Sequence, residues 1–121
     1  MPDAYLLMLL RPAGEEWEVV RLPLELARRV LKRLGGECGD VAADDEHAYF
    51  LTSMDGGGTA WPGVVRWYTA GDWLTLPAEY RTAPPALHWA CGPHFPHRLT
   101  PPQRLRAALA AESGQGEGSG R

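Results

Sequence analysis

The sequence contains no asparagine and no isoleucine, and Lys32 is its only lysine beside eleven arginines. The missing residues are encoded by AT-rich codons, so we interpret their absence as the mark of a GC-rich coding sequence. Adaptation to heat is a weaker interpretation, because proteins from hyperthermophiles are usually enriched in lysine. The biased composition therefore says little about fold or function.

Long apolar runs and abundant cysteine are also missing. No stretch approaches the roughly 20 apolar residues that a membrane helix needs. Residues 1–10 are apolar, but they lack the basic start and the small-residue cleavage site of a secretion signal. Cys38 and Cys91 are the only cysteines, too few for a disulfide scaffold. We therefore expect a cytoplasmic protein whose cysteines are free thiols or metal ligands.

Strong charge of one sign is absent as well. The net charge is −3 and the pI is near 5.8, so no overall positive field attracts nucleic acid. The length of 121 residues suits one domain, and the hydrophobic share of 45% is ordinary for a globular protein. We expect one globular domain over residues 1–112 and a flexible Gly/Ser-rich tail over residues 113–121.

The hydrophobic pattern predicts an α+β fold built on an antiparallel sheet of about four or five strands. Residues 5–10, a run that is apolar enough to be buried on both faces, and residues 17–22 are expected to form one hairpin. Residues 64–69 and 73–76 are expected to form a second hairpin, antiparallel to a strand over residues 47–54. The remaining long connections are expected to be irregular, at residues 37–46 and 77–96.

Two helices are expected to accompany the sheet. The amphipathic helix spans residues 23–34 and ends at Gly35-Gly36, with a buried stripe at Ala27, Val30, Leu31 and Leu34. A short C-terminal helix is expected over residues 100–111, where Thr100 would be the N-cap and Gln103 would complete a capping box. The first helix would pack on one face of the sheet and the second at an edge.

Four side chains that can bind zinc or titrate near neutral pH recur at every third residue of one segment: His88, Cys91, His94 and His97. Neighbouring prolines favour polyproline II, whose rise of about 3.1 Å per residue would hold successive groups roughly 9 Å apart. The ligands of one zinc ion lie about 2.0–2.3 Å from the metal, so an extended chain cannot chelate with all four. The regular spacing is therefore no support for a metal site.

A tight turn at Gly92-Pro93 would bring Cys91 and His94 together, and His97 or the distant Cys38 would then complete a zinc site. The chain offers no second closely spaced pair of ligands. Zinc bound by Cys91, His94 and His97 is therefore the alternative hypothesis, and an ordinary surface loop is the favoured one.

The same segment allows a cysteine nucleophile. Cys91 would be activated by His88 or His94, with Asp72 orienting the histidine. Cysteine and histidine can meet at almost any spacing, and no oxyanion-hole motif accompanies them. We therefore predict no catalytic residues and expect a binding protein rather than an enzyme.

One face of the predicted 23–34 helix is basic and could contact the phosphates of a nucleic acid. Its residues are Arg28, Arg29, Lys32 and Arg33. Such a face is usually the solvated side of an amphipathic helix, and the acidic segment 44–46 could neutralise it. Nucleic-acid binding is therefore an alternative function.

Five tryptophans in a small domain offer more apolar area than one modest core needs. We interpret the excess as a protein–protein interface, with another protein or a second copy of the chain as partner. The expected interface residues are Trp61, Trp67, Tyr68 and Trp73. The favoured function is thus a small non-catalytic interaction or regulatory protein that needs no cofactor.

Overall fold

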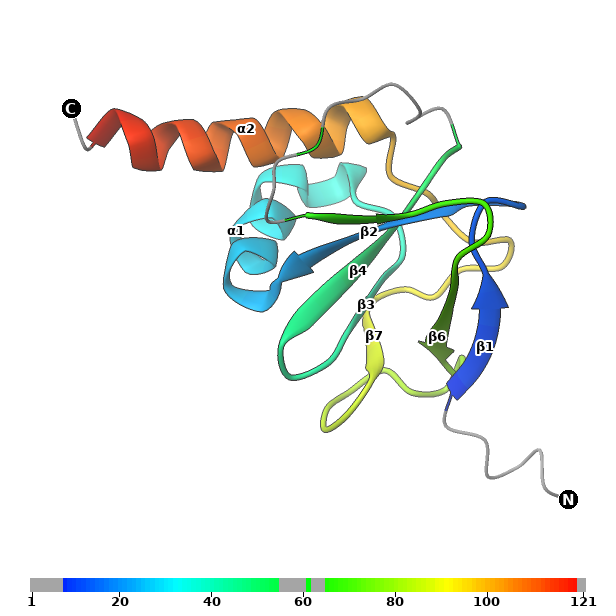
Figure 1. Cartoon of the computed structure of the whole chain (residues 1–121). Helices are drawn as coiled ribbons and strands as arrows, with labels where there is room; N and C mark the ends of the chain where they lie inside the picture. The colour runs from blue at the N-terminus through cyan, green and yellow to red at the C-terminus, as the bar shows by residue number, and fades with distance from the viewer. Residues whose placement is uncertain (1–7, 55–60, 62–64, 120–121) are drawn as a thin grey trace, which may run out of the picture.

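The computed structural model describes residues 8–54, 61 and 65–119 of the chain. A five-stranded antiparallel sheet lies between two helices on one face and a two-stranded ribbon on the other (Figure 1). The predicted α+β class is confirmed. The main sheet has the expected size, and the ribbon adds a second sheet that was not predicted.

The sheet has the strand order β5-β2-β4-β3-β7, and the ribbon pairs β1 with β6. The strands are β1 (Met8–Pro12), β2 (Glu18–Pro23), β3 (Val41–Ala43), β4 (His47–Thr52), β5 (Arg66–Tyr68), β6 (Trp73–Pro77) and β7 (His88–Cys91). The helices are α1 (Leu24–Leu34) and α2 (Pro102–Ser119), and a 3-10 turn, η2 (Gly35–Glu37), follows α1.

The central strands send alternate side chains into two separate cores, because neighbouring residues of a strand point to opposite faces. Val20 and Phe50 face the helices, whereas Val19 and Leu51 face the ribbon. All four side chains are fully buried. The sheet is therefore apolar on both faces, since each face has its own cover.

Helix α1 confirms the predicted helix over residues 23–34. It begins after Pro23, buries Ala27, Val30 and Leu34, and ends at Gly35, whose φ of 53° suits a residue without a side chain. The Gly35 N–H donates to the carbonyl of Leu31. This helix depends on local spacing and on a local stop signal, which is why the pattern predicts it well.

Helix α2 is longer than predicted, since it runs to Ser119 rather than residue 111. Leu105 and Leu109 are fully buried against the helix-side core. The expected capping box is wrong, because α2 begins at Pro102 rather than directly after Thr100. The Thr100 hydroxyl accepts a hydrogen bond from Gly39 N at 2.8 Å and so contacts a distant segment. Within the described ranges, no helix combines the length and apolarity needed to cross a membrane.

Both predicted hairpins are wrong. Strand β1 pairs with β6, not with β2, while β5 pairs with β2 and not with β6. Two tight connections carry the chain from one layer to the other, and they bond to each other through Ala13 N and Asp72 O at 2.9 Å. Gly14 of the first connection lies so close to Ala70 of the second that a Cβ at position 14 would lie 2.3 Å from Ala70 N. The short loops therefore join layers rather than neighbouring strands.

The ribbon also corrects the expected burial of the first strand. Residues 5–7 of that prediction lie outside the described residues. Within β1, Leu10 is exposed rather than buried on both faces, because only one face of the ribbon contacts the sheet.

Strands β3 and β7 lie in segments that were expected to be irregular. Strand β3 is only three residues long and buried throughout, so it shows no alternation. Strand β7 contains a bulge: Ala42 lies opposite Trp89 and Val41 opposite Cys91, which leaves Ala90 without a register partner. The bulge sends Trp89 into the ribbon-side core and Cys91 towards the helix-side core.

Candidate functional site

A buried aspartate, Asp40, holds the loop between β7 and α2. Its side chain is 0% exposed, and its carboxylate accepts hydrogen bonds from His94 N at 2.9 Å and from His94 Nδ1 at 2.6 Å. His97 Nδ1 lies 2.7 Å from the second carboxylate oxygen. Asp40 N also donates to the carbonyl of Arg98 at 2.7 Å. Two of the three predicted zinc ligands therefore converge on a carboxylate.

The environment of Asp40 has opposing effects on its pKa. Burial raises the pKa of the carboxyl, but the hydrogen bonds from His94 and His97 outweigh burial and lower the pKa below its ordinary value. Asp40 is therefore an ionised acceptor at neutral pH. The histidine Nδ1 atoms then act as donors to this carboxylate.

Gly92 lets the loop pass close to Asp40. Its φ is 89°, in the left-handed region that favours glycine. A Cβ at this position would lie 2.4 Å from Asp40 Oδ1, so the space admits no side chain. The chain at Gly92-Pro93 therefore brings His94 to Asp40, whereas the predicted tight turn was expected to bring His94 to Cys91.

The two histidines differ in their surroundings. The side chain of His94 is 51% exposed and that of His97 is 16% exposed. The His97 ring lies 4.9 Å from the ring of Phe95, 5.4 Å from that of Trp89 and 6.3 Å from that of Trp17, measured between centroids. His97 is therefore a packed part of an aromatic cluster, whereas His94 covers Asp40 from the solvent side.

Two adjoining hollows open beside His97, and we call them together the loop groove. The first has a volume of about 230 Å³ and the second about 200 Å³. Arg11, Phe95 and His97 line both. The first is otherwise mainly apolar, with Leu9, Leu76 and Trp89 among its walls, and the second adds Glu15, Glu16 and Trp17.

The loop groove offers His97 acidic and aromatic neighbours, among them Glu15, Glu79 and Tyr80. Its described walls include no serine, threonine or cysteine beside His97. The alternative triad of Cys91, a histidine and Asp72 is not assembled either, because Asp72 accepts from Thr69 N, and His88 Nδ1 contacts the carbonyl of Ala86. The carboxylate of Asp40 instead orients the two imidazoles of His94 and His97.

Cys91 lies next to Cys38, on the opposite side of the sheet from Trp89, whose ring contacts His97. Burial, together with the nearby Cys91, raises the pKa of the Cys38 thiol to about 12, although a hydrogen bond with Thr100 opposes the shift. Both cysteines are free, with Cys38 buried and Cys91 half-buried. The β7 bulge explains this separation, since it sends Cys91 to the opposite side of the sheet from Trp89.

We expect iodoacetamide at neutral pH to modify Cys91 well before Cys38. The thiolate is the reactive species, and Cys38 is both buried and held protonated. Peptide mass spectrometry over a time course measures each rate. A Cys91→Ser protein should stay unmodified until it is unfolded, and equal rates at the two positions would contradict the expectation.

The structure does not assemble the predicted zinc site. Across the described part of the chain, no group of three or more histidine, cysteine, aspartate or glutamate side chains is arranged to hold a metal ion. His94 and His97 both contact the Asp40 carboxylate, whereas Cys91 interacts with Cys38. Zinc binding by Cys91, His94 and His97 remains a prediction that metal analysis of the purified protein can test.

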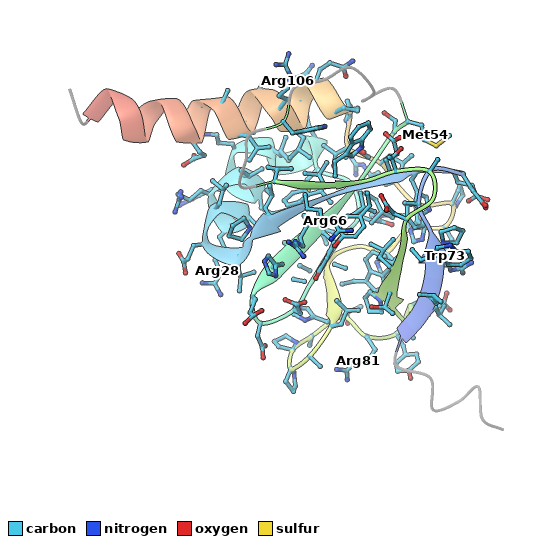
Figure 2. All side chains as sticks on the ribbon, viewed as in Figure 1. Arg28, Met54, Arg66, Trp73, Arg81 and Arg106 are labelled. Carbon is cyan, nitrogen blue, oxygen red and sulfur yellow. The ribbon has the colours of Figure 1, made fainter. Side chains whose placement is uncertain are left out.

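The four expected interface residues do not form one surface. Trp61 and Trp67 are half-buried against the helix-side core, and Trp67 Nε1 donates to Glu18 at 3.3 Å. Tyr68 is buried in the ribbon-side core. Of the four, only Trp73 is largely exposed, at 58%, and Figure 2 shows it pointing outward from the ribbon.

A third hollow, which we call the aromatic hollow, contains two of these residues. Its volume is about 370 Å³ and it lies where the ribbon meets the ribbon-side face of the sheet. Its walls are Asp44, Tyr49, Tyr68, Trp73, Leu74, Thr75 and Leu87. Tyr68 and Trp73 are therefore brought together, while Trp61 and Trp67 lie on the other side of the sheet.

The basic face of α1 is partly neutralised, though not by the acidic segment 44–46. Arg29 Nε and Arg33 Nε contact the Glu112 carboxylate of α2 at 3.0 and 2.6 Å. Arg28 pairs with Glu25 at 3.3 Å. Three of the four predicted phosphate-binding side chains thus have carboxylate partners. Nucleic-acid binding by this face remains a prediction.

Comparison of the sequence with models of protein families gives no match. Searches of curated proteins and of solved structures give none either.

Several residues of these sites were not expected from the sequence. No sequence motif points to any of the following residues: Arg11, Asp40, Tyr49, Tyr80 and Phe95. Asp40 is also 54 residues from its partner His94. One available signal was that Asp40 directly precedes an apolar run, where a buried carboxylate needs partners. The residues that could supply those partners cannot be read from local spacing.

Proposed function

We propose that the protein is a small non-catalytic domain that binds another protein through its ribbon side. One observation carries the proposal. Of the five large apolar side chains that are exposed within the described ranges, four lie on the ribbon or on the loops beside it, and Met54 is the exception. The four are Leu10, Trp73, Tyr80 and Phe95. Exposed apolar side chains that gather on one side are typical of protein interaction surfaces.

The size of the loop groove supports a protein partner. Each of its two hollows is smaller than the roughly 300–1,000 Å³ of typical sites for cofactors and drug-sized ligands. Single side chains of a partner fit such hollows. Phe95, which is 61% exposed, forms the shared wall and would be covered by the bound partner.

The Asp40 anchor supports the proposal through pre-organisation. A loop that is held by hydrogen bonds to a buried carboxylate loses little conformational entropy when a partner binds. Phe95 and His97 are thereby presented in one arrangement. In this proposal Asp40 positions the binding loop and takes no part in chemistry.

A cytoplasmic location and a regulatory role belong to the same proposal. The two free cysteines support a reducing compartment. A domain whose exposed apolar residues lie mainly on the ribbon and its neighbouring loops suits regulation by binding. No cofactor is needed for this activity.

Site-specific photo-crosslinking tests the proposal. We expect benzoyl-phenylalanine at position 95 to give a discrete protein adduct in cells that produce the protein, because this ring lies in the interface. The same group at Ala110, which is exposed on α2, serves as the control. The mass of the adduct distinguishes a second copy of the chain from a different protein.

Competition makes the crosslink specific. Excess unlabelled protein should abolish the adduct at position 95, whereas excess Phe95→Ala protein should compete poorly. A position-95 adduct no stronger than that at position 110, or equal competition by both proteins, would refute the proposed surface.

A further inference from the structure

The aromatic hollow combines three aromatic rings with one carboxylate, and each comes from a different part of the fold. Tyr49 belongs to β4, Tyr68 to β5 and Trp73 to β6, while Asp44 precedes β4. The volume of about 370 Å³ lies within the range of small-ligand sites, unlike either hollow of the loop groove. The hollow therefore has the size and composition of a binding site for a small chemical group.

The rings enclose the hollow at an angle rather than stacking. The centroids of Tyr49 and Tyr68 are 6.5 Å apart and their planes differ by 57°. The indole of Trp73 is largely exposed, so part of its area is free to cover a ligand. Each ring face carries partial negative charge, which attracts a cation that lies against it.

The carboxylate of Asp44 adds a full negative charge at the same place. Glu46 N and His47 N donate to its Oδ1, both at 2.8 Å, and Tyr49 Oη donates to Oδ2 at 3.1 Å. Burial raises the pKa of Asp44, but these hydrogen bonds outweigh burial and lower it. Asp44 is therefore ionised at neutral pH and attracts positive charge into the hollow.

A neighbouring side chain shows that one of these rings accepts a cation. The guanidinium carbon of Arg66 lies 4.5 Å from the centroid of the Tyr68 ring. Arg66 is not among the walls of the hollow, so it contacts Tyr68 from outside. Its charge opposes a second cation at the same ring, and the charge of Asp44 offsets this repulsion.

We propose that the aromatic hollow binds a quaternary ammonium group. A primary ammonium has three N–H donors that all need acceptors, and the one carboxylate of the hollow already accepts three hydrogen bonds. The remaining side-chain acceptors are the hydroxyls of Thr75 and of the two tyrosines. A quaternary ammonium has no N–H donor and presents methyl groups, which pack against aromatic faces while the charge is attracted to the rings and to Asp44. This proposal does not depend on protein binding at the loop groove.

Titration followed by NMR, with the tryptophan indole N–H signals as the readout, tests the proposal. We expect choline to shift the Trp73 signal among the five indole signals. The neutral tert-butyl isostere of choline should bind about tenfold more weakly, because it has the shape without the charge. Equal binding of choline and its neutral isostere would overturn the proposal. So would the absence of a Trp73 shift with both choline and a short trimethyllysine peptide.

Variants of residues outside the two cores locate the site: Trp73 is exposed and Asp44 is half-buried. Trp73→Ala should abolish choline binding, which is then read from neighbouring backbone amides, and Phe95→Ala is the matched control on another exposed ring. Asp44→Asn should weaken binding about tenfold while its amide oxygen still accepts from the turn. Unchanged binding by both the Trp73 and the Asp44 variants would overturn the proposal.

Arg66→Gln is the most discriminating variant. Removing a competing cation should tighten the binding of choline. Weaker binding would mean that Arg66 attracts the ligand, which would overturn the assignment of a cation. A short peptide with trimethyllysine, compared with choline, then identifies the source of the group: tighter binding of the peptide indicates a modified protein, and tighter binding of choline indicates a free metabolite.

Discussion

Asp40→Ala should lower the free energy of unfolding by about 3 kcal/mol. Removing a buried acceptor leaves its donors without partners, and a hydrogen bond to a charged group contributes about 1.5–3 kcal/mol. His94 N and the two histidine Nδ1 atoms lose their acceptor together, although the exposure of His94 moderates the loss. Urea unfolding followed by tryptophan fluorescence measures the change.

The control for this prediction is Asp45→Ala, which removes an exposed aspartate five positions along the chain. It should change stability by no more than about 0.5 kcal/mol, as surface substitutions usually do. If the two variants were equally stable, Asp40 would not anchor the loop.

The contribution of Asp40 should also depend on pH in a defined direction. Its pKa is lower in the folded protein than the value of about 3.9 in an unfolded chain. Its stabilisation is therefore fully present above about pH 4 and is lost as the pH falls through the folded pKa. The gap in unfolding free energy between the wild type and Asp40→Asn should narrow in acid, and a constant gap would contradict this origin.

Gly39→Ala should destabilise the protein by at least about 2 kcal/mol. A Cβ at this position would lie 2.4 Å from the carbonyl oxygen of Arg98 and 2.7 Å from the carbonyl carbon of Leu99. Both are backbone atoms, so no side-chain rotation relieves the overlap. The two segments must move apart, and the Asp40 N–H to Arg98 hydrogen bond is lost with their contact. Thermal unfolding by circular dichroism measures the loss.

Gly36→Ala is the matched control for this clash. It is the same substitution three residues away, and a Cβ there meets no atom within 4 Å. Its effect should be small and could even be stabilising, since alanine restricts the unfolded chain. Equal losses at both positions would point to backbone conformation rather than to close packing as the cause.

Features of the fold that depend on neighbouring residues were predictable from the sequence. The predicted stripe repeats with the helical period, and α1 buries Ala27, Val30 and Leu34 of it while Leu31 is half-buried. Strand β4 was likewise expected, because its apolar and aromatic residues stand together. Strand pairing was not predictable. Strands β1 and β6 pair although they lie far apart in the sequence, and no pattern in either strand indicates its partner.

The candidate sites divide in the same way. Spacing drew attention to Cys91, His94 and His97, and the structure does give the two histidines a common partner. That partner is Asp40, which lies 54 and 57 residues away. The bulge in β7 turns Cys91 to the other side of the sheet, and a one-residue irregularity of this kind has no sequence signal here.

The sequence by itself determined the α+β class, the amphipathic α1 helix and the concentration of histidines in one segment. These properties follow from composition and from periodicity within a few residues. The tertiary structure decided which strands pair, which aromatic residues remain exposed, and that the histidines bind a buried carboxylate. Each of these depends on contacts between distant segments, whose free energy is gained only when both faces of the sheet are covered at once.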